Sequence, residues 1–181
     1  MTTAKRGLVI GSFLMLMLLL FPVKALAANE ENAEVSRLLQ DASDDAAALS
    51  RDADEMEALT RTDVSWQTHA SMLETVKDHV NQLARVTEQL QAKRSMASPW
   101  QQQAIDRMMP LLKELATNTT AAINHLKDHK TRPTSGSYPE YLKQNAETAH
   151  ALSDMVSSFV RYDQTRAKLE RLEQRLEIAT N

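Results

Sequence analysis

After Ala27 the sequence contains a single glycine, Gly136. Glycine supplies turns, bulges and phosphate-binding loops in β-rich and nucleotide-binding folds, so its scarcity argues against both classes. It also allows helices to continue for many turns without interruption. The chain of 181 residues has the length of about one domain, which excludes a large multi-domain enzyme. These features predict an all-α protein made of a few long helices.

The chain has no cysteine. This excludes a disulfide-stapled fold, a thiolate zinc site, a cysteine nucleophile and covalent attachment of c-type haem. The sequence also lacks a Gly-x-Ser-x-Gly elbow, a glycine-rich phosphate loop and a His-Glu-x-x-His motif. We therefore predict that the protein is not an enzyme.

Residues 1–27 have the layout of a secretory signal peptide. Lys5 and Arg6 precede the apolar stretch Gly7–Phe21, and the segment Ala25–Ala27 provides a small-x-small cleavage site. An uncleaved membrane anchor is the alternative, but the apolar stretch is shorter than the roughly 20 residues that cross a bilayer. We predict cleavage after Ala27, a periplasmic or secreted protein without a membrane span, and a single helical domain over residues 28–181.

Apolar residues recur at spacings of three and four along four segments of this domain. The pattern predicts helices at about Glu30–Thr60, Ser65–Arg94, Ser98–Lys130 and Tyr138–Ile178, with a clear loop at Thr131–Ser137. Short connections between long helices are typical of an antiparallel up-down-up-down bundle. The fourth helix is the longest, so we expect its end to extend beyond the other three.

The third predicted helix has proline at two positions with different consequences. Pro99 follows Ser98, which places it at the first helical position, where its missing N–H costs nothing. Pro110 lies inside the helix, where it removes a backbone hydrogen bond and clashes with the preceding turn. We expect a kink in this helix near Arg107.

Three pieces of the same helix have a familiar sequence: Pro99–Arg107 (PWQQQAIDR), Pro110–Ala116 (PLLKELA) and Ala121–Leu126 (AAINHL). This stretch resembles a group of uncharacterised exported helical proteins from environmental bacteria. The resemblance implies an exported helical protein and brings no activity, cofactor or site residue to this chain.

A group of histidines is the strongest candidate for a ligand site. In an antiparallel bundle, His69 lies level with His125, His129 lies one turn further along, and Met56 on the first helix lies at nearly the same height. Imidazoles could bind a transition metal here, and His69 with Met56 could bind haem. The alternative is that His69 only closes the end of the core, while His125 and His129 are solvated. We predict no cofactor, and keep a metal- or haem-binding bundle as the second hypothesis.

The end of the fourth helix combines leucines with charges of both signs. Leu169, Leu172 and Leu176 have the spacing of a coiled-coil contact, so this segment is a candidate for self-association. Exposed residues near the loop before this helix, including Tyr138 and Tyr141, are candidates for binding an envelope protein.

The charge distribution excludes one further class of partner. Ten of the chain's 24 Asp and Glu residues lie before Thr60, and loss of the signal peptide changes the formal charge from −3 to −6. With no basic stripe, nucleic acid is not an expected ligand. We predict an exported helical bundle that acts by binding or structural association in the cell envelope.

Overall fold

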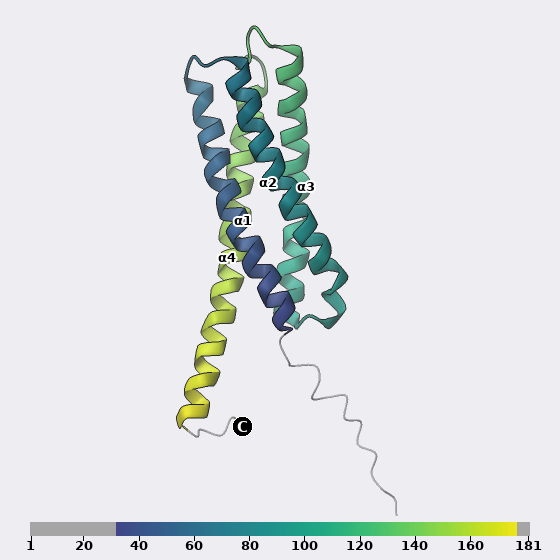
Figure 1. Cartoon of the computed structure of the whole chain (residues 1–181), viewed down its shortest axis with the longest axis vertical. Coiled ribbons are helices and arrows are strands. Elements are labelled where there is room, and N and C mark those ends of the chain that lie inside the picture. The colour runs from purple at the N-terminus through teal and green to yellow at the C-terminus, as the bar shows by residue number, and fades with distance from the viewer. Residues whose placement is uncertain (1–31, 177–181) are drawn as a thin grey trace, which may run out of the picture.

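The computed structural model describes residues 32–176, and these residues form an all-α, antiparallel four-helix bundle (Figure 1). The helices are α1 (Ala33–Ala58), α2 (Trp66–Ala92), α3 (Pro99–Asp128) and α4 (Tyr138–Leu176). The predicted fold class is confirmed, and each predicted helix is present with ends shifted by a few residues. The predicted signal peptide, residues 1–27, lies outside the described part of the chain.

Side chains at the helix starts explain why the helices begin where they do. Asn32 Oδ1 accepts hydrogen bonds from the backbone N–H groups of Glu34 and Val35, at 3.0 and 3.2 Å. Ser65 Oγ accepts the N–H of Thr68 at 3.3 Å and so starts α2. Each cap satisfies a donor that the first helical turn leaves without a partner.

Gln101 fastens the start of α3 to the start of α1. Its side chain is completely buried, and its Oε1 accepts the N–H of Ser98 at 2.9 Å. Its Nε2 donates to the carbonyl of Asn32 at 3.1 Å and to Ser36 Oγ at 3.0 Å. One amide therefore caps a helix and joins two segments far apart in the sequence.

The connections at the other end of the bundle are also tight. At that end the short 3₁₀ turn η2 (Leu59–Arg61) follows α1, whereas η3 (Arg94–Met96) follows α2 at the same end as Gln101. The loop before α4 contains Gly136, whose φ of +59° is strained for any residue with a Cβ. A Cβ at this position would lie 3.4 Å from the His125 ring, so the loop packs closely on α3.

The core follows the apolar stripes that the sequence predicts. Completely or almost completely buried large side chains come from all four helices: Leu39, Leu49, Met56, Leu73, Leu83, Leu90, Ile105, Met108, Leu115, Tyr138, Leu142 and Leu152. Burial of such side chains is the main favourable contribution to folding. The described residues thus form one continuous core along the bundle axis.

Two features of the longer helices bear on function. Pro110 lies inside α3, which continues on both sides of it, and the kink expected there stays a prediction. α4 has 39 residues and runs past the starts of α1 and α3 (Figure 1). Among residues 32–176, no helix combines the length and apolar character that a membrane crossing requires.

Candidate functional site

Four ring side chains form a cluster at the loop end of the bundle, which we call the histidine–tyrosine cluster: His69, His125, His129 and Tyr138. The ring centroids of His69 and Tyr138 are 5.5 Å apart, and those of Tyr138 and His125 are 5.4 Å apart. His125 stacks on His129 with centroids 4.1 Å apart. The structure therefore brings three of the four predicted ligand candidates together, with Tyr138 between His69 and His125.

His69 and Tyr138 are completely buried, and their polar atoms meet. The Tyr138 hydroxyl is hydrogen-bonded to His69 Nδ1 at 3.3 Å, while His69 Nε2 is buried with no hydrogen-bond partner. Burial lowers the pKa of His69 and raises the pKa of Tyr138, because it penalises the charged form of each group. Both side chains are neutral members of the core near pH 7.

Tyr138 corrects the prediction that placed it among exposed binding residues. Its ring is completely buried because it fills the space between His69 and His125 at the start of α4. Tyr141, the other tyrosine of that prediction, is half-buried and packs against the core. The Tyr138 ring therefore offers no surface beside the loop, whereas part of Tyr141 stays accessible.

The histidine pair on α3 is not arranged to chelate a metal. The rings of His125 and His129 are nearly parallel, with an angle of 11° between their planes. Nitrogen lone pairs lie in the ring plane, so two stacked rings direct them side by side and not toward one point. His129 Nδ1 also lies 3.0 Å from the His125 carbonyl. Across residues 32–176, no group of three or more His, Cys, Asp or Glu side chains is placed to hold a metal ion.

Met56, proposed with His69 as a haem ligand, is a buried core residue in the last turn of α1. His125 Nε2 is buried without a hydrogen-bond partner, and burial together with the neighbouring His129 lowers the pKa of His125. The cluster thus offers two unsatisfied imidazole nitrogens, on rings that lie on either side of Tyr138. This arrangement closes the core at the loop end of the bundle.

Histidines of neighbouring helices contact the acidic face of α1. His79 Nε2 on α2 lies 2.9 Å from Asp52, and His150 Nε2 on α4 lies 2.8 Å from Asp54. His150 Nδ1 also lies 3.0 Å from Ser50 Oγ. These histidines join helices and are occupied in doing so.

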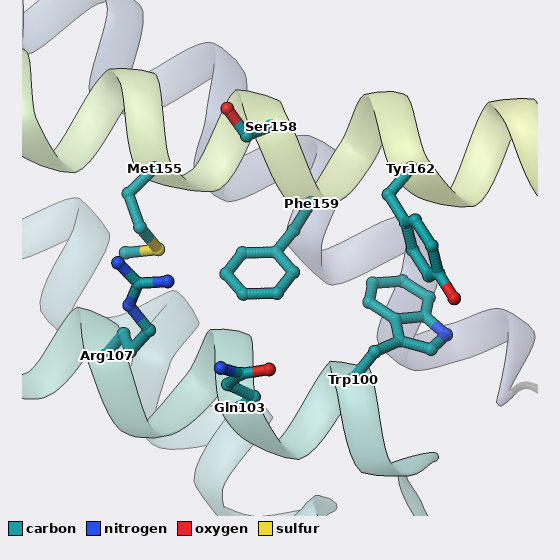
Figure 2. Close-up of a pocket in the computed structure, with 7 residues that line it drawn as sticks. All are labelled: Trp100, Gln103, Arg107, Met155, Ser158, Phe159 and Tyr162. Atoms are coloured by element: carbon teal, nitrogen blue, oxygen red, sulfur yellow. The ribbon is translucent and has the colours of Figure 1, made fainter.

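An aromatic groove lies between α3 and α4 at the opposite end of the bundle (Figure 2). Its volume is about 470 Å³, within the range of small-molecule and peptide pockets. Phe159 points into the space between the helices, with Trp100 and Tyr162 to one side and Arg107 and Met155 to the other. The groove is lined by Trp100, Gln103, Arg107, Met155, Ser158, Phe159 and Tyr162.

The rings of the aromatic groove pack on one another. Trp100 stacks on Phe159 with centroids 6.4 Å apart, and it meets Tyr162 edge-on at 5.6 Å. The guanidinium of Arg107 lies 5.8 Å from the Phe159 centroid, and that of Arg166 lies 5.8 Å from the Tyr162 centroid. Cations over aromatic faces are favourable by about 0.5–1 kcal/mol at exposed sites. The groove is thus lined by aromatic rings that contact one another, and two guanidinium groups neighbour these rings.

α4 continues past its last buried residue, and we call residues 161–176 the projecting end. At its start, Tyr162 lines the groove and Gln164 Nε2 donates to Gln40 Oε1 of α1 at 3.5 Å. Val160 is the last buried residue of the described part of α4. Leu169, Leu172 and Leu176 are 55%, 41% and 64% exposed. The projecting end carries five basic and three acidic residues, in contrast to the acidic α1. Isolated exposed leucines are common, but three in one stripe are typical of a contact surface.

The groove and the projecting end share one stripe of α4. Met155, Tyr162, Leu169 and Leu176 are seven residues apart, and Ser158, Thr165 and Leu172 fall between them. A seven-residue repeat keeps a stripe on one side of a supercoiled helix, which is the geometry of a coiled-coil seam. We call these seven residues the heptad stripe.

Comparison with models of protein families, with curated proteins and with solved structures gives no match for this chain. The candidate site is therefore defined by its own geometry. Sequence reasoning identified the leucines of the projecting end but missed the groove. Trp100 and Phe159 lie on different helices, so their stacking depends on how α3 and α4 are rotated relative to each other. The position of each ring relative to the apolar stripe of its own helix indicates that both lie at the edge of the core.

Proposed function

We propose that this protein is exported to the cell envelope and acts there by association with another protein, not by catalysis. The aromatic groove and the projecting end of α4 together form the association surface. Export is supported by the layout of residues 1–27, with Lys5 and Arg6 before the apolar stretch and Ala25–Ala27 after it.

One observation carries the proposal for association. The heptad stripe leaves the bundle with its apolar residues uncovered, and Leu176, at its far end, is 64% exposed. A helix that carries such a stripe alone is only marginally stable in water, because most helical stability in proteins comes from packing of the apolar face. The projecting end therefore gains stability by packing against a second helix.

Sedimentation of the untagged protein over a wide concentration range tests this proposal. We expect reversible association of the parent protein, and loss of association in the double variant Leu169→Glu/Leu172→Glu, because the change would place four carboxylates in the apolar contact of a pair. Met109→Glu provides the control, since Met109 is also exposed, at 49%, but lies outside the heptad stripe. Association of the double variant equal to that of the parent would overturn the role of the projecting end.

Native mass spectrometry of protein made in an export-competent host tests the other parts. Cleavage after Ala27 and recovery from the envelope fraction are the expected results, and full-length protein in the cytoplasm would contradict export. The same spectrum reports bound cofactor. Extra mass of a metal or haem that disappears in His69→Ala would favour the cofactor-binding hypothesis over association.

A further inference from the structure

The heptad stripe includes residues that line the aromatic groove and, further along α4, the exposed leucines of the projecting end. The leucines of one copy could therefore pack on the groove of another. The aromatic groove lies at one end of the stripe, beside Tyr162, and exposed leucines lie at the other end. Tyr162 and Leu172 are equally far from Ala167, and so are Ser158 and Leu176. An arrangement with both features on one helix, at matched distances from a point, is self-complementary under a two-fold axis through that point.

We propose that two copies of this chain pair through antiparallel α4 helices, so that the projecting end of each copy lies on the aromatic groove of the other. This inference rests on the proposed association and names its partner as a second copy. With the two-fold axis at Ala167, Leu172 of one copy packs on Tyr162 of the other. Leu176 then reaches the level of Ser158, at the rim of the groove.

The distribution of charge favours the antiparallel arrangement over a parallel one. After the proposed cleavage each copy has a formal charge of −6, and α1 alone carries eight carboxylates and two arginines. Antiparallel pairing places the two acidic bundles at opposite ends of the shared helices, whereas parallel pairing places them side by side. Like net charges repel, and separation by more than a Debye length of about 8 Å at physiological salt screens most of that repulsion.

The size of the contact indicates how strong the pair is. Residues 158–176 of the two copies overlap, and about half of their side chains face the partner, joined by Trp100 from α3. This is below the roughly 20–30 residues per side of a standard interface, so we expect a dissociation constant on the order of 10⁻⁶ M. Pairing that left the groove empty and joined only the last three turns would bury still less surface.

Disulfide trapping distinguishes the orientations, because the chain has no cysteine of its own. Single variants Ser158→Cys and Leu176→Cys are oxidised separately and as a mixture. A disulfide requires Cα atoms about 4.4–6.8 Å apart. In the antiparallel pair, residue 158 of one copy meets residue 176 of the other. Identical positions are separated by about 27 Å along the helix axis, at 1.5 Å per residue.

We expect cross-linked dimers in the mixture, in which about half of the pairs combine the two variants, and none from either variant alone. Cross-linking of Leu176→Cys by itself indicates a parallel pair and overturns this inference, while the proposed association remains. No cross-link in any sample, together with dimers of the parent protein by sedimentation, also overturns the inference alone. A parent protein that is monomeric at every concentration overturns both.

Discussion

The hydroxyl of Tyr138 lies 3.3 Å from Nδ1 of His69, and both side chains are completely buried. Tyr138→Phe removes this hydrogen bond and leaves both nitrogens of His69 without a partner. A buried polar group that loses its partner costs about 1–3 kcal/mol, so we expect the free energy of unfolding to fall by this amount. Urea denaturation followed by circular dichroism measures it.

Tyr141→Phe is the matched control, since Tyr141 lies one turn further along α4 and packs against the same core. We expect a change within about 0.5 kcal/mol for this variant. Equal losses in the two variants would show that the Tyr138 hydroxyl contributes nothing specific.

His69 also predicts how stability depends on pH. Burial holds the folded-state pKa of His69 below its ordinary value of 6.5, so the unfolded chain binds the proton more tightly. The contribution of neutral His69 to the free energy of unfolding is fully present above pH 6.5. It is lost progressively as the pH falls below this value. Each unit of difference between the two pKa values changes the free energy of unfolding by about 1.4 kcal/mol. We expect a lower midpoint of urea denaturation at about pH 5.5 than at about pH 8.

The comparison with His69→Gln isolates this contribution. Glutamine keeps a polar side chain beside Tyr138 but does not titrate, while the pairs His79–Asp52 and His150–Asp54 are present in both proteins. The variant should lose less stability than the parent between the two pH values. A loss in the variant as large as in the parent would assign the acid sensitivity to other groups.

The fold could be predicted from sequence because its signals are local. The caps Asn32 and Ser65, the proline after Ser98 and the glycine before α4 act within a few residues, and each occurs at a helix boundary. Apolar spacing then decides which face of each helix is buried. The same reasoning brought His69 level with His125, because antiparallel helices joined by short turns have fixed relative heights.

The site could be predicted only in part because it depends on contacts between helices. Nothing near Tyr138 in the sequence indicates that its ring is inserted between two histidines of other helices. The groove likewise forms where the aromatic edges of α3 and α4 meet, and periodicity gives no measure of that rotation. The leucines of the projecting end were predictable, because their spacing is a property of one helix and does not depend on its contacts with other helices.

Pro110 predicts a gain in stability on substitution. Its ring removes the backbone hydrogen bond to residue 106 in the interior of α3, and Pro110 is exposed, so no core contact depends on it. Proline in a helix interior is about 3 kcal/mol less favourable than alanine. We expect Pro110→Ala to raise the free energy of unfolding by about 1–3 kcal/mol in urea denaturation. A loss of stability would show that the bundle packs around a kink and strains when α3 is straightened.

Lys168 predicts different effects on association for the two orientations of the pair. In the antiparallel pair the two-fold axis brings the same flank of each helix together, so Lys168 lies beside Lys168 of the second copy. In a parallel coiled coil, Lys168 instead faces Glu173 of the second copy, which is favourable. Lys168→Glu exchanges one like-charge contact for another in the antiparallel pair, so association should change little, whereas a parallel pair loses two favourable contacts. Exposed charge pairs contribute about 0.2–1 kcal/mol each, so a parallel pair should show a roughly two- to thirtyfold higher dissociation constant in sedimentation experiments.

Lys113→Glu is the control for this variant. It makes the same change of charge on α3, away from the heptad stripe, and should leave association nearly unchanged. A higher dissociation constant for Lys168→Glu than for Lys113→Glu would contradict the antiparallel pair.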